Sequence, residues 1–376
     1  MEPPTTPGAQ VEVPPAVIDE LQSSYWVSSW WFAALVLVVV VLLIAFFVVW
    51  LRRRRHLEAH RRRVVLVSVG ATVLVVIAAG AFANSYSGYI PNASAAIALA
   101  KGLVGSHQAT GATSTRGGLE VITMPGDAAG SIPASQAWVY TPPGYDPQGS
   151  VRYPVLYLFH GTPGRSSDWF VAGNADNAMN VLLAHGLVEP MILVSIDVNG
   201  GGKRADTECL DWDDGPRLET WMLSDVVPFI DANYLTVPDR SSRAIGGMSS
   251  GGFCALNLAL RNLDTWSVML SFEGYGDPGS AGDDAFKGDT ERIQANSPSV
   301  YLPTMKFTEP LAAYLDVGTE TRDVYDVRAV AQQLADRGQT VLFRTNEGES
   351  HTWSEVQAGL PYALIFASTH LTHPAP

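Results

Sequence analysis

Two long runs of apolar residues stand near the start of the chain. The first covers residues 30–51 without a charged side chain, and the second covers residues 64–82 with only two hydroxyl residues as polar interruptions. An α-helix rises about 1.5 Å per residue, so each run is long enough to cross a bilayer core of roughly 30 Å. Trp30 and Trp31 begin the first run, and aromatic rings of this kind suit the membrane interface. We therefore predict a transmembrane hairpin at residues 29–83, and not a buried helix of a soluble protein.

Seven arginines crowd the loop at residues 52–63, between the two runs. Loops rich in arginine stay on the cytoplasmic side of a membrane, and a nucleic-acid patch does not fit between two apolar spans so close together. The expected protein has two spans in the plasma membrane, with residues 1–28 and 84–376 outside the cytoplasm. An Ala-x-Ala pattern ending at Ala83 leaves one alternative open, in which a signal peptidase cuts there and releases the C-terminal part.

The segments on either side of the hairpin differ in composition. Residues 1–28 hold five prolines and four acids but no Lys or Arg, which is typical of a short disordered tail. Residues 84–118 are rich in Ala, Gly, Ser and Thr, which indicates a linker with room for a short helix at residues 95–103.

From residue 119 to residue 371 the pattern is that of one α/β domain. The expected strands are residues 119–124, 136–140, 154–160, 191–197, 243–247, 266–273, 313–317 and 340–344. The expected helices are residues 177–185, 218–232, 251–261, 324–337 and 353–368. No helix separates the first two strands, whereas the later strands mostly alternate with helices. We therefore predict a mainly parallel eight-stranded sheet with helices on both faces, which begins with an antiparallel hairpin.

Composition narrows the functional classes. The net charge is −13, which argues against a nucleic-acid binder because such proteins present a basic surface to phosphates. Cys209 and Cys254 are the chain's two cysteines, so a disulfide-rich scaffold and a four-cysteine zinc site are excluded. Both cysteines lie outside the cytoplasm in the expected topology, where a disulfide between them is permitted but not required.

The sharpest chemical signal is Gly247-Met248-Ser249-Ser250-Gly251, which reads G-x-S-x-G between an expected strand and an expected helix. A strand-to-helix turn this sharp leaves no space for side chains at its flanking positions, hence the glycines. The turn lifts the serine hydroxyl clear of the sheet, and the following helix N-terminus favours a developing negative charge. We predict that Ser249 is a nucleophile, and not part of an ordinary glycine-rich turn or a phosphate-binding loop.

A serine nucleophile needs a general base and an acid that orients the base. In folds of this kind the chain order is nucleophile, acid, histidine, and His351 follows the last expected strand. The acid is expected in the loop after residues 313–317, where Asp323 is favoured and Glu320 is the alternative. His160 precedes the serine, so a structural role bonded to nearby backbone is expected for it.

Other residues complete the predicted site. The strand that ends before His160 runs into a glycine-rich turn, so the backbone N–H groups of Thr162 and Ser250 are the expected oxyanion donors. Trp169 and Trp353, together with Trp212, are candidates to line the substrate cleft, although ordinary packing explains these tryptophans nearly as well. Acidic loops near residues 211–214 and 283–289 lack EF-hand spacing, so no metal site is predicted.

These motifs together resemble the putative-esterase branch of the α/β-hydrolases, the group that includes esterase D and the antigen 85 mycolyltransferases. The matching segments are residues 158–164, 223–234, 245–252, 315–319 and 351–353. The resemblance implies an α/β-hydrolase fold and ester hydrolysis or acyl transfer without a metal or an organic cofactor. Relatives place the acid three or four residues after the loop glycine, whereas Asp323 stands five residues after Gly318, so the acid position departs from the pattern.

The resulting hypothesis is a membrane-anchored extracytoplasmic serine esterase or acyltransferase that acts through an acyl-enzyme on Ser249. A tether to the membrane favours lipid, glycolipid or cell-envelope esters as substrates. The sequence does not separate hydrolysis from acyl transfer, because the two differ only in which nucleophile resolves the acyl-enzyme. The alternative is a catalytically silent hydrolase fold that serves as a binding or assembly module at the membrane.

Overall fold

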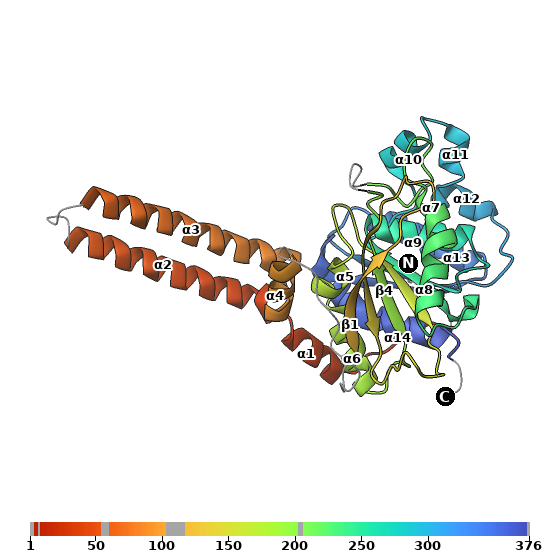
Figure 1. The fold of residues 1–376 in the computed structure, drawn as a ribbon, viewed down its shortest axis with the longest axis horizontal. Coiled ribbons are helices and arrows are strands. Elements are labelled where there is room, and N and C mark those ends of the chain that lie inside the picture. Colours follow the sequence, from red (N-terminus) through yellow and green to blue (C-terminus); the bar gives the residue numbers. More distant parts are fainter. Residues whose placement is uncertain (1–3, 7, 54–59, 103–116, 202–205, 374–376) are drawn as a thin grey trace.

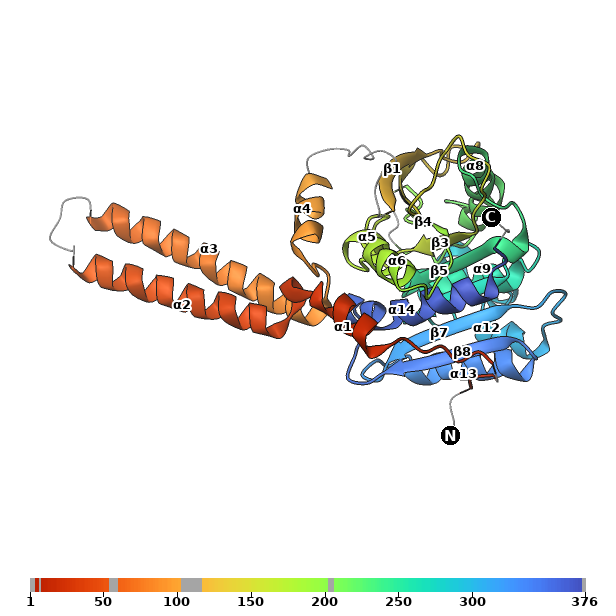
Figure 2. The same ribbon diagram turned by 90° about the horizontal axis from the view of Figure 1, so that it is seen from below.

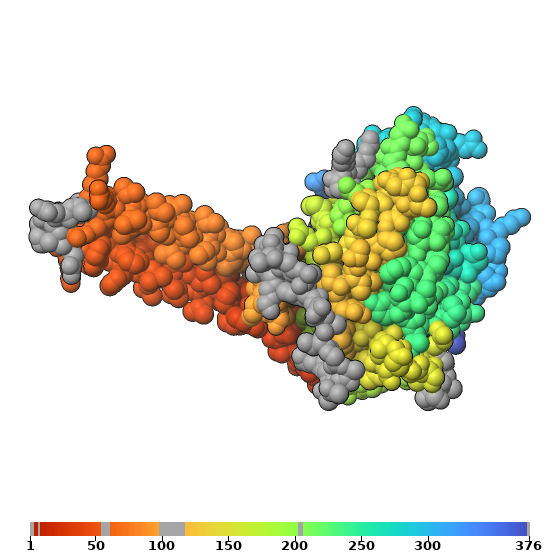
Figure 3. All heavy atoms as spheres, in the orientation of Figure 1, coloured from red at the N-terminus to blue at the C-terminus, as the bar shows by residue number. Residues whose placement is uncertain are grey.

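The computed structural model describes residues 4–6, 8–53, 60–102, 117–201 and 206–373. A long helical hairpin projects from a C-terminal α/β domain that begins at residue 117 (Figures 1 and 2). Figure 3 shows these parts as a narrow arm attached to a broad body. The arm is the part of the chain with the two long apolar runs, and the body is the part in which the expected strands and helices alternate.

The C-terminal domain is built on one eight-stranded sheet, in the order β1-β2-β4-β3-β5-β6-β7-β8. The strands are β1 (Gly118–Met124), β2 (Ser135–Thr141), β3 (Val155–Phe159), β4 (Ile192–Ile196), β5 (Arg243–Met248), β6 (Val268–Phe272), β7 (Ala312–Gly318) and β8 (Thr340–Asn346). β2 pairs antiparallel with both β1 and β4, and all other neighbours are parallel. All eight predicted strands are therefore confirmed, as is the opening hairpin.

Helices cover both faces of this sheet. They are α5 (Asp168–Val171), α6 (Ala175–Ala184), α7 (Leu218–Trp221), α8 (Val227–Asn233), α9 (Ser250–Arg261), α10 (Gly279–Ala285), α11 (Thr290–Gln294), α12 (Pro298–Tyr301), α13 (Val324–Asp336) and α14 (Trp353–His370). A π-helical turn at Met222–Val226 joins α7 to α8. The sequence did not predict α5 or α10–α12, because a helix of four to seven residues is too short to show a helical period.

The alternation of side chains along the strands divides the core into two layers. In β3, Val155, Tyr157 and Phe159 face the layer formed with α7, α8, α9 and α13. Leu156 and Leu158 face the opposite layer, which α6 and α14 complete. Successive strand residues point to opposite faces, so a strand buried on both sides is apolar throughout, as β3 is.

The hairpin consists of α2 (Trp30–Arg53) and α3 (His60–Ser87), which lie side by side along their length (Figure 2). Both helices are long and apolar enough to cross a membrane, with mean hydropathies of 3.5 and 2.6 over their most apolar windows. Most of their apolar side chains are exposed to the surroundings of the protein. Residues 54–59 of the arginine-rich loop lie outside the described residues.

The N-terminal segment does not match the disordered tail expected for residues 1–28. The hydroxyl and backbone groups of Thr5 and Thr6 bond Val341 and Phe343 along the open edge of β8. The segment continues into α1 (Pro15–Ser23) and then a short 3-10 helix, Trp26–Ser28. Its buried residues recur every four positions, at Ala9, Val13, Val17 and Leu21, and pack into the core layer of α6 and α14. This apolar stripe outweighs the proline-rich composition on which the expectation of disorder rested.

The expected linker is also partly structured. α3 continues to Ser87, past the predicted end of the hairpin, and α4 (Ala93–Gly102) follows close to the predicted short helix. The residues between α3 and α4 bond the C-terminal domain directly, so this stretch is a fixed junction and not a spacer. Residues 103–116 of the expected linker lie outside the described residues.

Candidate active site

Ser249 occupies the turn between β5 and α9, with backbone angles φ 59° and ψ −122°. Non-glycine residues rarely adopt a positive φ, and such strained conformations concentrate at functional sites. A Cβ at Gly247 would lie 2.0 Å from the carbonyl oxygen of Gly251, and one at Gly251 would lie 2.4 Å from that of Phe159. The steric argument for the two glycines of the motif is therefore confirmed.

Ser249 and His351 line the same cavity, which has a volume of about 200 Å³. Loops at the carboxyl edge of the sheet supply most of its wall, as the strand–turn–helix pattern requires. The described lining residues are Ser87, Gly161, Thr162, Pro163, Asp168, Met248, Ser249, His351, Thr352 and Trp353. The structure thus brings the predicted nucleophile and base to one cavity, although they stand about a hundred residues apart in the sequence.

Two carboxylates approach the Nδ1 atom of His351 among the described residues. Oε2 of Glu273 lies 3.4 Å from Nδ1, and Oδ2 of Asp323 lies 4.0 Å from it. Neither distance is that of a formed hydrogen bond, but catalytic hydrogen bonds are often long before a substrate binds. Glu273 has no exposed surface, whereas the side chain of Asp323 is 41% exposed. Burial strengthens the interaction of a carboxylate with imidazolium, so Glu273 is the stronger partner.

Glu273 was not recognised as a site residue in the sequence. Glu273 follows β6 directly, and β6 is the neighbour of β5, the strand that ends before Ser249. The N–H of Ser249 donates to the carbonyl of Phe272, the residue before Glu273. Like Ser249, Glu273 has a positive φ, of 50°. Its Oε1 accepts the N–H of Gly318 at 2.7 Å, and its Oε2 is buried with no hydrogen-bond partner among the described residues. The sequence does carry a signal, because a charged residue directly follows a buried strand. The predicted strand at residues 266–273 includes Glu273 and so hides this signal.

The two acids predicted from the sequence lie farther out. Asp323 stands at the N-terminus of α13, and Glu320 is exposed in the preceding turn. The N–H of Glu320 donates to the carbonyl of Glu349, which ties this turn to the loop that carries His351. The loop after β7 therefore reaches the base, as expected, but its nearest carboxylate, that of Asp323, is partly exposed to solvent.

A second group of buried acids lies behind Glu273. Asp316 in β7 accepts hydrogen bonds from Arg344 Nη1 at 2.8 Å, from Asn346 Nδ2 at 2.9 Å and from the hydroxyl of Tyr314. Asn346 Nδ2 also bonds Glu355 at 3.0 Å. Burial, and then the nearby charges of Asp316 and Glu273, raise the pKa of Glu355 well above its usual range.

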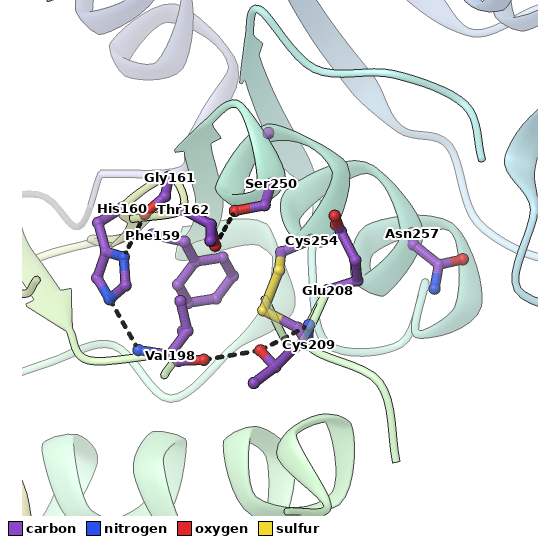
Figure 4. The surroundings of a disulfide bond; sticks show 12 residues. Phe159, His160, Gly161, Thr162, Val198, Glu208, Cys209, Ser250, Cys254 and Asn257 are labelled. Carbon is purple, nitrogen blue, oxygen red and sulfur yellow. Dashed lines mark hydrogen bonds between the residues drawn. A yellow bond between two sulfur atoms is a disulfide. The ribbon is translucent and has the colours of Figure 1, made fainter. Parts of the chain in front are cut away.

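The turn after β3 faces Ser249 from the other side. The hydroxyls of Thr162 and Ser250 lie 2.9 Å apart, which ties the two predicted oxyanion residues together (Figure 4). His160 is fully buried, and its ring lies within hydrogen-bond distance of the Gly161 carbonyl and the Val198 N–H. This histidine therefore has the structural role expected for it.

The tryptophans divide between the cavity and the core. Trp353 lines the cavity, as predicted. Trp169 has no exposed surface, and its ring meets that of Trp353 edge to face at 5.4 Å. Its Nε1 donates to the Phe159 carbonyl, so Trp169 supports Trp353 from behind and does not face the cavity. Trp212 packs beside Phe253 in a separate small cluster, away from the cavity.

Cys209 and Cys254 form a disulfide, with Cα atoms 5.4 Å apart. It joins the loop after β4 to α9, about one turn after Ser250 (Figure 4). The pairing left open by the sequence is therefore confirmed, and it fixes the helix whose N-terminus follows Ser249.

Comparison with known proteins agrees with this geometry. A family model described as Putative esterase matches residues 135–366, more than half of the chain. The chain belongs to this family. The match covers β2 to α14 and includes Ser249, Glu273 and His351, and it confirms the resemblance inferred from the motifs.

Individual relatives match over shorter stretches. An uncharacterized protein of Corynebacterium glutamicum is 31% identical over 182 residues, which are 47% of this chain and 42% of that protein. An endo-1,4-beta-xylanase/feruloyl esterase of Xylanibacter ruminicola is 32% identical over 39% of this chain and 20% of its own length. The chain thus spans less than half the length of these relatives.

Solved structures show the same fold at low identity. A ferulic acid esterase has a TM-score of 0.61 and 22% identity, over 68% of this chain and 99% of its own. The S-formylglutathione hydrolase of Agrobacterium tumefaciens has a TM-score of 0.59 and 15% identity, over 70% and 99%. These likenesses confirm the predicted α/β-hydrolase fold for the C-terminal domain.

Proposed function

We propose that this protein is a membrane-anchored serine esterase or acyltransferase that acts on carboxylic esters through an acyl-enzyme on Ser249. The observation that carries the proposal is the strained turn of Ser249 opposite His351 in one cavity. A positive φ at a serine is retained against its conformational cost, and the close packing around Gly247 and Gly251 belongs to the same turn. Membership of the esterase family supports the same chemistry.

In the proposed reaction, Ser249 attacks the ester carbonyl while His351 takes its hydroxyl proton. The alcohol then leaves with that proton, and the acyl group stays on the serine oxygen. Glu273 orients the imidazole and stabilises its charged form, because its free Oε2 is the nearer carboxylate oxygen to Nδ1. This assignment replaces Asp323 and Glu320 as the proposed acid.

The backbone N–H groups of Thr162 and Ser250 are proposed to hold the developing oxyanion. The contact between their hydroxyls supports this role, since it fixes two loops that border Ser249. Ser250 is also the first residue of α9, where the helix dipole favours negative charge. Trp353 is proposed to contact the substrate from the cavity wall.

The location outside the cytoplasm is likewise a proposal. The two apolar helices and the arginines around the loop at residues 52–63 support a plasma-membrane hairpin with the C-terminal domain outside. The disulfide between Cys209 and Cys254 supports the same side, because disulfides persist in oxidising compartments. A lipid or cell-envelope ester suits a domain held at a membrane. The same acyl-enzyme gives hydrolysis when water attacks it and acyl transfer when an acceptor alcohol attacks it.

The test uses the full chain in detergent with a fluorophosphonate probe and a series of p-nitrophenyl esters of increasing acyl length. The wild type is expected to be labelled and to release p-nitrophenol, and Ser249→Ala is expected to lose both. Ser150→Ala is the matched control for labelling, because it removes the hydroxyl of an exposed serine that does not line the cavity. A wild type that is neither labelled nor active would overturn the proposal in favour of a silent binding module. Labelling that persists in Ser249→Ala would show that Ser249 is not the nucleophile.

A further inference from the structure

The end of α3 forms part of the active-site cavity. Ser87, the last residue of this helix, lines the cavity together with Ser249 and His351. The hydroxyl of Tyr86 lies 3.0 Å from the hydroxyl of Ser350, which precedes the proposed base. The hairpin therefore contributes a wall to the site and does not act as a remote tether.

Side-chain hydrogen bonds fix this junction to the C-terminal domain. Nε2 of Gln357 donates to the carbonyls of Gly88 at 2.8 Å and Ala172 at 2.7 Å, inside the protein. The hydroxyl of Tyr89 donates to Oδ1 of Asp168, another cavity residue, at 2.8 Å. Hydrogen bonds to a charged or buried partner contribute more than exposed ones, so the junction holds the cavity at a set position relative to the hairpin.

The position of the cavity along the hairpin follows from the sequence. The apolar run of α3 ends at Phe82, and Ser87 is five residues farther along the same helix. At a rise of about 1.5 Å per residue, the cavity wall stands roughly 7 Å beyond the apolar span. The headgroup region on each side of a bilayer is also roughly 5–7 Å thick. In the proposed membrane placement, the cavity rim lies at the depth of the headgroups.

Exposed aromatic side chains mark the same level on both helices. Trp30 is 77% exposed and begins α2, while Phe82 and Tyr86 are 73% and 68% exposed near the end of α3. Asn84 joins these ends, because its Nδ2 donates to the carbonyls of Val27 and Ile90. Tryptophan and tyrosine favour the membrane–water interface, so these aromatic residues favour a position of the junction at that interface.

We propose that the substrate is an ester-bearing amphiphile embedded in the membrane leaflet that faces the C-terminal domain. Its acyl chain stays in the bilayer while its ester reaches Ser249 past Ser87 and Tyr86. The serine oxygen bonds the acyl carbon, the alcohol leaves with the proton from His351, and water or a second alcohol then takes the acyl group. This inference rests on the proposed esterase function and adds its substrate class and direction of entry.

A vesicle experiment separates this inference from the proposed function. The full chain is reconstituted into vesicles of non-hydrolysable ether lipids doped with a glycerolipid that carries a pyrene-labelled acyl ester. We expect release of the labelled acid from lipid in the same vesicles to exceed that from lipid in separate, protein-free vesicles by about 100-fold, because co-embedding raises the effective concentration. A soluble p-nitrophenyl ester reports the chemistry in both preparations.

Each outcome has one meaning. Equal release from same and separate vesicles, or turnover of the soluble ester alone, overturns the inference and leaves the proposed function standing. Loss of activity on the lipid and on the soluble ester overturns the proposed function itself. Faster release from the same vesicles, with Ser249→Ala inactive on both substrates, supports both.

A change in cavity height provides an independent test. Seven polar, helix-forming residues are inserted both between Ser29 and Trp30 and between Phe82 and Ala83, which raises the domain by about 10 Å while nearly preserving helix phase. The junction beyond Asn84 is unchanged, so soluble-ester turnover is expected to stay within about twofold while lipid-ester turnover falls about 100-fold. The same seven residues inserted at the exposed turn of residues 147–149 serve as control. Lipid-ester turnover that stays within about twofold in the raised variant, with soluble-ester turnover intact, would contradict the placement at headgroup depth.

Discussion

Oε2 of Glu273 lies 3.4 Å from Nδ1 of His351, inside the protein and at the end of the strand next to the nucleophile turn. The competing carboxylate of Asp323 is farther away and partly exposed to water. A solvated charge interacts more weakly with imidazolium than a buried one does. It therefore also holds the imidazole ring less firmly in one orientation. The relationship between Glu273 and His351 thus decides which acid the reaction is expected to use.

Replacement of the two acids should separate them clearly. Glu273→Gln is expected to lower kcat by about a thousandfold, because the amide favours the wrong imidazole tautomer and cannot stabilise the imidazolium. Asp323→Asn is its matched control and is expected to change kcat by less than about threefold, as for a screened surface charge. Hydrolysis of a p-nitrophenyl ester measures both. A larger loss in Asp323→Asn would return the acid to the loop after β7.

The nucleophile turn should not tolerate a methyl group at Gly251. The new Cβ would lie 2.4 Å and 2.6 Å from the carbonyl oxygens of Phe159 and His160, so backbone must move. Gly251→Ala is expected to destabilise the protein by about 1–3 kcal/mol and to abolish labelling of Ser249. Gly80→Ala is the control, because no atom lies within 4 Å of its Cβ position. Thermal unfolding and fluorophosphonate labelling report the two effects, and normal labelling of Gly251→Ala would contradict the steric account.

The disulfide should contribute measurable stability. It closes a loop with a sequence separation of 45 residues, so the double variant Cys209→Ser/Cys254→Ser is expected to lose about 2–4 kcal/mol. Thermal unfolding with and without reductant measures the loss. Reductant should lower the Tm of the wild type to nearly that of the double variant and leave the double variant unchanged. A wild-type Tm that does not respond to reductant under unfolding conditions would show that the bond adds nothing.

Glu208, beside Cys209, should make stability depend on pH. Burial raises the pKa of this carboxyl to about 9 from the ordinary value of 4.5, and Tyr275 donates a hydrogen bond to its Oε1. The folded protein therefore holds a proton that the unfolded chain releases, and this stabilisation is complete below about pH 4 and is lost as the pH rises towards 9.

The variant Glu208→Gln removes this titration. Its Tm relative to the wild type is expected to rise steadily from pH 5 to pH 8, with an upper limit of about 1.4 kcal/mol per pH unit in relative stability. Thermal unfolding of both proteins across this range measures the difference. A Tm difference that is constant with pH would mean that the carboxyl is ionised in the folded protein.

Much of the fold was predictable because its signals are local. Strands such as β3 and β5 are short apolar runs bounded by turns, and the nucleophile turn combines its glycines with a strand and a helix in a fixed order. Each of these features depends on neighbours within a few residues. Ser249 and His351 therefore became candidates from the sequence, and the structure brings them to one cavity.

The features that escaped prediction depend on distant contacts. Glu273 differs from other strand-end acids only through Gly318 and His351, which lie more than forty residues away in sequence. The N-terminal segment is proline-rich, but its apolar stripe gains order only against α6 and α14. The exposed loop after β7 offered acids in the expected chain order, whereas Glu273 is distinguished by its burial beside His351.

The N-terminal segment alters what a single cut in the hairpin would do. Thr5, Thr6 and residues 8–25 contact β8, α6 and α14. The chain then leaves the C-terminal domain, runs through α2 and α3, and returns to the domain at Tyr89. Cleavage after Ala83 would break the chain within α3. The N-terminal segment, which precedes α2, would still bind the C-terminal domain. Release of the domain from the membrane would therefore require either a second cut or the dissociation of this N-terminal segment from the surface of the domain.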